Sequence, residues 1–217
     1  MLQRVLWSCV LVGLALTTRA DAQIIPRAPR GAEPQSPYYV GLSYGLFELG
    51  TYEDGRSNTQ WNFGYTTAVT ATLEKTLSAG AAVGIEAAFA NPKLNYNPIG
   101  SFTCPTGCTA TADVTQFLGT GRIGGGFLGF RSSFVLEVGA TQFANFRDVT
   151  TDTRLNGVGG RWDPTFGTGY DFGVALTPRT DLYLETGLLF VMHDQGNTVT
   201  AAPPINYTLK VGVRQGF

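Results

Sequence analysis

Residues Ile205 to Phe217, INYTLKVGVRQGF, alternate between two kinds of side chain along their whole length. Because a β-strand points successive side chains to opposite faces, this stretch has two different faces. One face is apolar except for a glutamine: Ile205, Tyr207, Leu209, Val211, Val213, Gln215 and Phe217. The other is polar, charged or glycine: Asn206, Thr208, Lys210, Gly212, Arg214 and Gly216. Such a strand suits a barrel wall with lipid outside and a polar lumen inside.

Seven earlier stretches show the same two-faced alternation. In chain order they are Tyr39–Phe47, Trp61–Glu74, Gly80–Ala90, Ala112–Gly124, Phe130–Phe143, Thr165–Leu176 and Leu182–His193. A tilted strand crosses a bilayer with about 9–11 residues, and every stretch is long enough for this. The sequence therefore predicts an all-β fold, an eight-stranded antiparallel up-and-down transmembrane β-barrel with short periplasmic turns and longer extracellular loops.

The composition favours the same fold. Charged residues make up 14% of the 217 residues, against roughly 25% in soluble domains. The chain has 28 glycines, and aromatic residues reach 12%. No run of about 20 apolar residues follows the N-terminal region, which excludes a spanning helix from the body of the chain. The net charge of −1 gives no reason to expect a nucleic-acid partner, and we expect no cofactor and no metal.

The N-terminal residues predict export. Arg4 supplies a positive start, an apolar core follows, and Ala20-Asp21-Ala22 is a small-residue cleavage site. We therefore expect residues 1–22 to be a signal peptide, cleaved after Ala22. Residues 23–37 are rich in proline and polar residues and predict a flexible periplasmic lead-in. Residues 38–217 then form the barrel.

The connections between the predicted strands alternate in length. Three are short: Lys75–Ala79, Gly125–Gly129 and Thr177–Asp181. Four are longer: Glu48–Gln60, Asn91–Thr111, Ala144–Pro164 and Asp194–Pro204. Short turns are typical of the periplasmic side and long loops of the outside. With an even number of strands, both ends of the barrel domain then lie in the periplasm.

The inward register of these strands carries few but balanced charges. They are Glu86, Arg122, Arg131, Glu137, Asp171, Glu185, Lys210 and Arg214. Buried charges are tolerated when they are paired, so we expect a salt-bridge network that fills the lumen. A gated proton or ion path is the alternative, although eight strands leave an interior just wide enough for side chains. A soluble lipocalin-type barrel is a rival fold, but its outer face would be charged.

Aromatic residues near the predicted strand ends predict interfacial girdles, with loop anchors as the alternative for some of them: Trp61, Phe63, Tyr183, Phe190 and Tyr207. Two cysteines in the run CPTGC, Cys104 and Cys108, follow the export signal, so we expect a disulfide. A redox or metal pair would need more ligands or a supporting fold. A disulfide in this loop would either preorganise it for an extracellular ligand or protect it from proteolysis.

The eight runs and the terminal VGVRQGF resemble the small eight-stranded outer-membrane proteins of Gram-negative bacteria, the OmpA/OmpX-like superfamily. The resemblance covers about residues 38–217. It implies that Phe217 is the assembly signal read by the barrel-assembly machinery, although Gln215 stands where an apolar or aromatic residue is usual. It also implies a place in the cell outer membrane, among its lipids and lipopolysaccharide. It does not imply one activity, and we expect a structural or surface-interaction role.

An enzymatic role is the alternative that His193 raises. Some barrels that resemble this one modify lipid A with a surface-side histidine assisted by Ser, Asp or Glu. His193 precedes Asp194 at the predicted outer end of a strand, but Gln195 stands where deacylase barrels have the serine of a His-x-Ser-Asn motif. The Asp–Ser loop pair of palmitoyltransferase barrels is not found either. We therefore expect no enzyme and no catalytic residue, with lipid A modification and small-ion conduction as alternatives.

Overall fold

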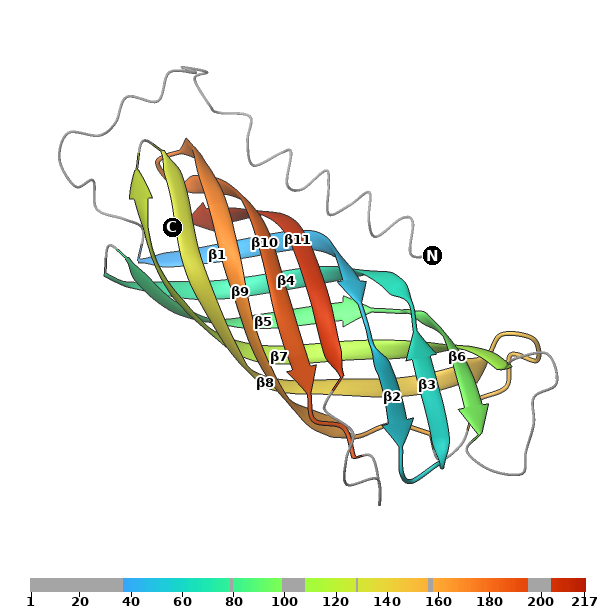
Figure 1. The fold of residues 1–217 in the computed structure, drawn as a ribbon. Coiled ribbons are helices and arrows are strands. Elements are labelled where there is room, and N and C mark those ends of the chain that lie inside the picture. The colour runs from blue at the N-terminus through green and yellow to red at the C-terminus, as the bar shows by residue number, and fades with distance from the viewer. Residues whose placement is uncertain (1–36, 79, 99–107, 128, 156–157, 195–203) are drawn as a thin grey trace.

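The computed structural model describes residues 37–78, 80–98, 108–127, 129–155, 158–194 and 204–217. Eight strands in these ranges form a closed antiparallel barrel (Figure 1). They are β1 Tyr38–Glu48, β4 Tyr65–Ser78, β5 Ala81–Ala90, β7 Cys108–Phe127, β8 Phe130–Asp148, β9 Trp162–Thr177, β10 Thr180–Val191 and β11 Ile205–Gly216. Each strand pairs with the next around the wall, and β11 pairs with β1 to close it. The predicted eight-stranded up-and-down barrel is confirmed.

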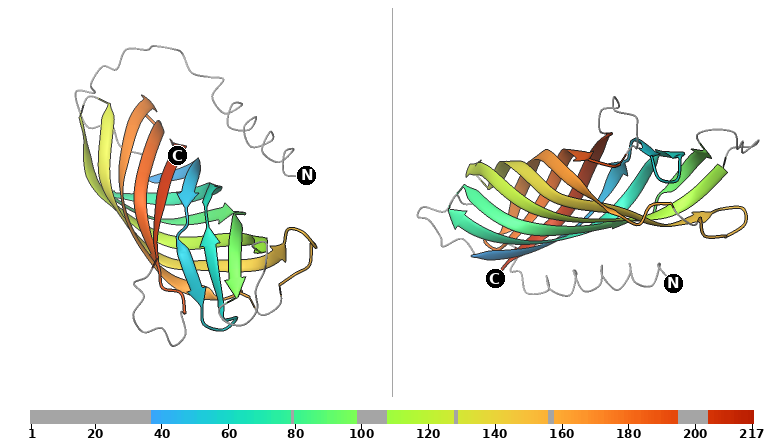
Figure 2. Two further views of the ribbon diagram at one scale, coloured as in Figure 1. Left: turned by 45° about the vertical axis from the view of Figure 1, so that its right-hand side comes forward. Right: turned by 90° about the horizontal axis from the view of Figure 1, so that it is seen from below.

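Three further strands extend the wall beyond one end of the barrel. They are β2 Thr51–Asp54, β3 Thr59–Phe63 and β6 Lys93–Pro98. Strand β2 pairs with β3, β3 with β6, and β6 with the first residues of β7, side by side in Figures 1 and 2. The prediction of loops at Glu48–Gln60 and Asn91–Thr111 is wrong for these parts. Their residues also alternate between polar and apolar, so they find ladder partners on neighbouring strands.

A one-residue irregularity separates the barrel from this extension. Phe63 pairs with Leu94, whereas Ala68 pairs with Ala90. From Phe63 to Ala68 the chain advances by five residues, whereas the facing segment from Ala90 to Leu94 advances by four. One extra residue therefore lies on the first of these segments, near Gly64. A bulge of this kind moves the side chains beyond it to the opposite face of the sheet.

The bulge corrects the prediction of one continuous strand over Trp61–Glu74. Trp61 and Phe63 were expected to face lipid, but they are 0% and 4% exposed and point inward. Beyond the bulge the expected register returns, and Tyr65 is 75% exposed on the outer wall.

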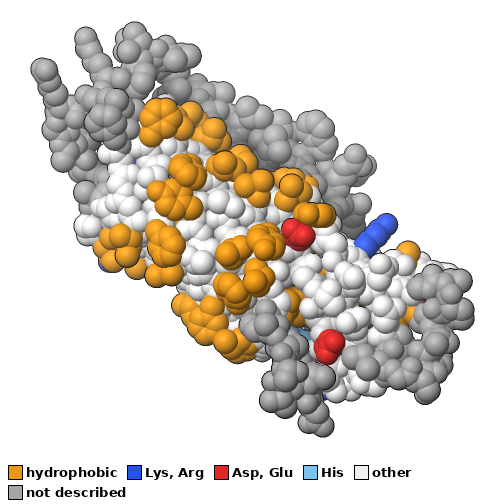
Figure 3. Space-filling view, viewed as in Figure 1, with side chains coloured by type: hydrophobic (Ala, Val, Ile, Leu, Met, Phe, Trp, Pro, Cys, Tyr) orange, Lys and Arg blue, Asp and Glu red, His pale blue; other side chains and the backbone are white. Residues whose placement is uncertain are grey.

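The outer wall of the barrel is covered by large apolar side chains. Exposed examples are Val40, Leu42 and Tyr44 on β1, Ile85 and Phe89 on β5, Phe117 on β7, Leu136 and Val138 on β8, Phe172 and Val174 on β9, Leu182 on β10, and Tyr207, Leu209, Val211 and Val213 on β11. On the face that Figure 3 shows, hydrophobic side chains gather over the barrel, with few over the extension. An apolar outer face around a charged interior is the arrangement of a membrane barrel, and the lipocalin-type arrangement is excluded.

The three short turns and both ends of the barrel domain lie together, at what we call the turn end. The backbone N of Phe217 donates to the carbonyl of Tyr38 at 3.1 Å, and the two rings stack with centroids 6.1 Å apart. The backbone N of Gly216 donates to the carbonyl of Arg179, in the turn between β9 and β10. The opposite end, which carries β2, β3 and β6, is the loop end. In the part of the chain that the structure describes, no helix is long and apolar enough to span a membrane.

Candidate functional site

Charged side chains fill the middle of the lumen. The eight residues predicted to point inward all lie on the inner face of the barrel wall. Seven of them are less than a tenth exposed: Glu86, Arg122, Glu137, Asp171, Glu185, Lys210 and Arg214. The eighth, Arg131, lies at the turn end with its side chain 38% exposed. These eight residues come from six different strands, and they meet because the inner faces of all six strands line the same lumen.

Two buried acids of this network were missed in the sequence. Glu74 is 5% exposed and Asp181 is 3% exposed. Glu74 belongs to the polar register of a predicted strand and could have been found there. Asp181 falls in a predicted turn, where the alternation that identifies inward residues gives no signal. Its carboxylate accepts a hydrogen bond of 2.6 Å from Arg131.

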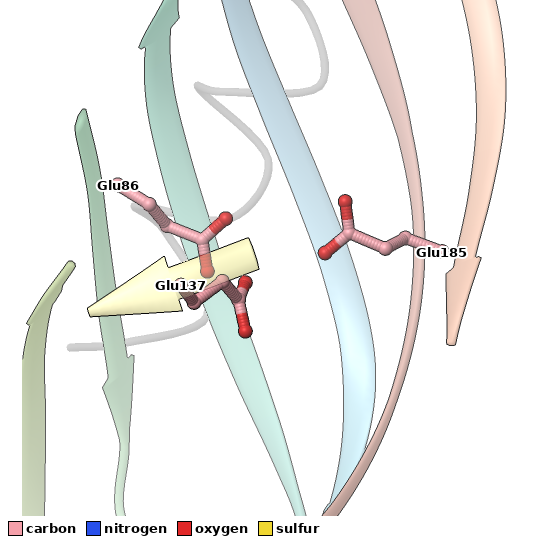
Figure 4. A group of neighbouring side chains, drawn as sticks. All are labelled: Glu86, Glu137 and Glu185. Atoms are coloured by element: carbon pink, nitrogen blue, oxygen red, sulfur yellow. The ribbon is translucent and has the colours of Figure 1, made fainter. Parts of the chain in front are cut away.

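Lys210, on β11, is the centre of one half of the network. Its Nζ lies 2.8 Å from Glu86 Oε1, 3.4 Å from Glu137 Oε1 and 2.6 Å from Glu185 Oε1. The three carboxylates come from β5, β8 and β10 and point toward one another, as Figure 4 shows. Their oxygens lie within 4.8 Å of one another, a spacing that could hold a metal ion. Because the Lys210 ammonium already contacts all three, the protein supplies this cation itself and we assign no metal.

Arg122, on β7, joins the rest of the network. Its Nε lies 2.7 Å from Glu74 Oε1, and its Nη1 lies 3.0 Å from Asp171 Oδ2. Its Nη2 lies 2.7 Å from Glu185 Oε2. Since Glu185 also contacts Lys210, one continuous chain of ion pairs crosses the lumen. Such charges would be costly singly, and their mutual pairing makes their burial tolerable.

Arg214 completes the network toward the turn end. It pairs with Asp171, and its Nε lies 3.7 Å from Glu74 Oε1. Its guanidinium stacks over the ring of Tyr183, 3.9 Å from the centroid, a cation–π contact. Between these groups and the turn end lies a cavity of about 310 Å³. It is lined by network residues and by the turns, and it is open at the turn end.

Glycines on the inner face make room for the long charged side chains. Gly45 lies opposite Lys210 in the β1–β11 register, and Gly167 lies opposite Glu137 in the β8–β9 register. A Cβ added at Gly167 would approach Glu137 Oε2 to 2.5 Å. The abundance of glycine in the sequence therefore follows partly from the packing of a narrow, charged lumen.

An aromatic layer closes the lumen toward the loop end. Its largest buried side chains are Phe47, Tyr52, Trp61, Phe63, Phe143 and Phe146. The rings of Trp61 and Phe146 have centroids 4.6 Å apart, and those of Tyr52 and Phe143 are 4.8 Å apart. In its described part, the lumen is therefore filled by aromatic side chains toward the loop end and by ion pairs toward the turn end.

The predicted aromatic girdle is therefore partly wrong. Trp61 and Phe63 belong to the aromatic layer because of the bulge near Gly64. Tyr183 is 3% exposed, because it lies on the inner register under Arg214. Tyr207 is 52% exposed on the outer wall. Phe190 is partly buried.

His193 lies beside the aromatic layer, between two carboxylates. Its Nδ1 lies 2.6 Å from Asp163 Oδ2, and its Nε2 lies 3.4 Å from Asp54 Oδ1. Its ring packs against Trp61, with centroids 4.8 Å apart. Burial alone would lower the pKa of His193, but the two carboxylates outweigh burial and raise this pKa to about 9. Burial would raise the pKa of Asp54, yet hydrogen bonds from His193 and Ser57 hold it below its usual value.

These three residues connect β2 of the extension to the paired ends of β9 and β10. Asp54 ends β2, Asp163 lies at the start of β9, and His193 follows β10. Close by, the backbone N of Gly55 donates to the carbonyl of Asp194 at 3.1 Å. The contacts tie the extension to the loop end of the barrel. A general base needs access to its substrate, whereas the side chain of His193 is 4% exposed, with Nδ1 against Asp163 and Nε2 facing Asp54.

The roles predicted for two other residues, Cys104 and Phe217, stay predictions. Cys104 lies outside the described residues, so the disulfide with Cys108 stays a prediction; Cys108 begins β7 and is 7% exposed. Phe217 is 61% exposed and stacks on Tyr38 at the turn end. This placement is compatible with recognition of the terminal ring, and its role as an assembly signal stays a prediction.

The chain has a closed antiparallel wall, an apolar exterior and a filled polar lumen. These features define the class of small eight-stranded outer-membrane barrels. No protein-family model matches the sequence. No curated protein matches it.

Solved structures of this class resemble the chain in fold. Neisserial surface protein A is similar with a TM-score of 0.55 and 10% identity, over 84% of this chain and 98% of that one. The outer-membrane protein OprG from Pseudomonas aeruginosa is similar with a TM-score of 0.53 and 10% identity, over 84% of this chain and 97% of that one. The predicted resemblance to small outer-membrane barrels is confirmed. At this identity the likeness shows the fold alone, and the apolar outer wall, together with that fold, places the barrel in an outer membrane.

Proposed function

We propose that the protein is a filled outer-membrane barrel whose role is structural or surface-interacting and is carried by its loop end. The observation that supports this most strongly is the chain of ion pairs from Glu74 through Arg122 and Glu185 to Lys210, which crosses the lumen. The aromatic layer above it adds a second barrier. A solute would have to break several buried ion pairs and displace packed rings to pass.

Bilayer recordings test this proposal against ion conduction. Purified barrel in a planar bilayer is expected to give no discrete conductance steps above the lipid background. An open porin reconstituted in the same way serves as the positive control. Reproducible steps that disappear when Lys210 is replaced would instead establish a channel through the ion-pair network.

The proposal places the turn end in the periplasm and the loop end outside, as the signal peptide and short turns predict. The partners then are outer-membrane lipid and lipopolysaccharide around the wall, the assembly machinery at Phe217, and an extracellular ligand at the loop end. Binding of purified barrel to host proteins and surface glycans tests the last of these. The matched control is a variant without β2 and β6, in which short Gly-Ser linkers replace Thr51–Asp54 and Lys93–Pro98. This variant keeps the barrel and removes two strands of the extension.

The same proposal assigns His193 a structural role instead of lipid A modification. Its support is the burial of the imidazole between Asp54 and Asp163. Mass spectra of lipid A from cells with and without the gene, and with His193→Ala, are expected to be the same. A lipid A species that depends on both the gene and His193 would contradict the proposal.

A further inference from the structure

The described part of the lumen holds more acid than base. Its carboxylates are Glu74, Glu86, Glu137, Asp171, Asp181 and Glu185, and its cations are Arg122, Arg131, Lys210 and Arg214. If all ten groups were ionised, two negative charges would lack a compensating cation. Uncompensated charge in a low-dielectric interior is strongly unfavourable, and it is relieved by binding a proton or a cation.

The deficit of positive charge is concentrated at Glu86 and Glu137. Each has one cationic contact among the described residues, Lys210 Nζ, at 2.8 Å and 3.4 Å. The same ammonium also contacts Glu185 at 2.6 Å. Glu185 has a second cation, Arg122 at 2.7 Å, so its charge is better compensated. One ammonium therefore serves two carboxylates that have no other cation in contact.

Two buried hydroxyl groups lie beside the same pair. Thr72 is directly opposite Glu86 in the β4–β5 register, and Thr120 is directly opposite Glu137 in the β7–β8 register. They are 4% and 5% exposed, and their Oγ1 atoms have no hydrogen-bond partner in the described part of the chain. A hydroxyl can donate and accept at once, so each can pass a hydrogen bond to a neighbouring carboxyl group or take one from it.

The two ends of the lumen differ in how open they are. The cavity of about 310 Å³ reaches Glu74, Arg122 and Arg214 from the turn end. At the loop end, Trp61 and Phe143 and the rest of the aromatic layer close the lumen. The turn end is therefore the more open side of the ion-pair network.

We propose that Glu86 and Glu137 form a proton-binding site that takes up one proton between them at neutral pH and exchanges it with the turn end. The proton adds to a carboxylate oxygen of one residue, and the resulting carboxylic acid donates to a carboxylate oxygen of the other. The pair then carries one negative charge instead of two, and Lys210 remains an ammonium. A proton fits where a second cation does not, because Lys210 Nζ already lies among the three carboxylates. This site does not depend on the surface role proposed above.

Other ionisable groups line the lumen around the pair, on the surrounding strands. They are Tyr39 on β1, Glu74 on β4, Arg122 on β7, Arg131 on β8, Asp171 on β9, Asp181, Tyr183 and Glu185 on β10, and Lys210 and Arg214 on β11. Of these, the other four carboxylates each contact a guanidinium. The site is therefore expected at Glu86 and Glu137 and not at another acid of the lumen.

Infrared spectroscopy of the full-length barrel at neutral pH tests the proposal, because a protonated carboxylic acid has a C=O band that a carboxylate lacks. The wild-type barrel is expected to show this band. Glu137→Gln and Glu86→Gln are each expected to remove it, since the remaining carboxylate then has Lys210 to itself. Asp181→Asn is the control that should keep the band, because Asp181 pairs with Arg131 near the turn end. Heat-modifiable gel migration confirms that each variant is folded, and either glutamate variant alone suffices for the test.

A second readout is proton uptake during folding from urea into micelles, followed with a pH indicator in weak buffer. The wild type is expected to take up about one proton more than Glu137→Gln, since the carboxylates of the unfolded chain are ionised at neutral pH. The absence of the band in the wild type, or its persistence in either folded glutamate variant, would overturn the proposal. A melting temperature that requires a particular metal cation, compared with an organic cation at equal ionic strength, would overturn it too, because a bound metal would then balance the charge.

Discussion

His193 Nδ1 lies 2.6 Å from Asp163 Oδ2, across 30 residues of sequence, and joins the segment after β10 to the start of β9. This contact and the one with Asp54 raise the pKa of His193 from 6.5 to about 9 in the folded protein, despite burial. A raised pKa means that the folded state holds the proton more tightly than the unfolded state. The stabilisation is therefore complete below pH 6.5 and is lost as the pH rises through about 9.

Fluorescence of Trp61 reports this titration, because its ring lies 4.8 Å from that of His193. In a Trp162→Phe chain without residues 1–22, the emission of Trp61 is expected to change as the pH rises through about 9. His193→Gln is expected to abolish the transition, and emission that titrates equally in that variant would contradict the assignment. The same variant should also make β2 and β3 more sensitive to added protease.

Lys210→Met should destabilise the barrel strongly, because it leaves Glu86, Glu137 and Glu185 without their shared ammonium. Removing one partner of a buried ion pair costs about 3–5 kcal/mol of unfolding free energy. Urea unfolding in micelles or vesicles measures this loss. Lys75→Met is the matched control: Lys75 is exposed at the turn end, and its replacement should change the free energy by less than about 1 kcal/mol. Equal effects of the two changes would show that the network adds nothing to stability.

Trp61→Ala should leave a cavity in the aromatic layer, where the side chain is 0% exposed. Truncating a buried tryptophan typically costs about 3–5 kcal/mol. Trp162→Ala is the control on the outer wall, where 46% of the residue is exposed, and its cost should be clearly smaller. Limited proteolysis within β2 and β3 compares the variants, and cleavage that is faster for Trp162→Ala than for Trp61→Ala would contradict the layer's role.

The barrel wall was predictable from the sequence because a strand with lipid on one side and charge on the other repeats every two residues. The bulge near Gly64 was not, since a glycine fits either face and one extra residue leaves the alternation on each side intact. For that reason Trp61 was placed on the wrong face. The cluster of Asp54, Asp163 and His193 was also out of reach, because only the closed topology brings β2 to the paired ends of β9 and β10.

The charged lumen could be predicted from the sequence only in part. Its residues could be identified from their register, and the balance of signs predicted that they pair. The sequence could not show that Lys210 serves three carboxylates at once, because this depends on which strands face each other across the lumen. Glu74 and Asp181 were also missed, Asp181 because its place at a turn hides its register, and with them the excess of acid over base.

Gly45→Ala should impair closure of the barrel, because the new Cβ would lie 2.3 Å from the carbonyl oxygen of Leu209 and 2.9 Å from Lys210 Cα. Both are backbone atoms of β11, the strand that closes the wall on β1, so relief requires the strands to separate. Gly121→Ala is the control, since a Cβ there would meet nothing within 4 Å. Heat-modifiable migration should show less folded barrel for Gly45→Ala and a normal amount for Gly121→Ala. Normal folding of Gly45→Ala would mean that the seam between β1 and β11 is more adaptable than its register indicates.

Deletion of Phe217 should lower the amount of assembled barrel in the outer membrane while leaving refolding of the purified chain nearly unchanged. The ring is 61% exposed and contacts Tyr38 alone among the described aromatic residues, so its loss removes little packing. A large assembly defect would therefore reflect recognition of the terminal residue and not stability. Phe217→Tyr keeps an aromatic ring and should assemble normally. The comparison needs both measurements, heat-modifiable migration in cell envelopes and refolding yield in micelles. Normal assembly after the deletion, or equal losses in the two assays, would remove Phe217 as the assembly signal.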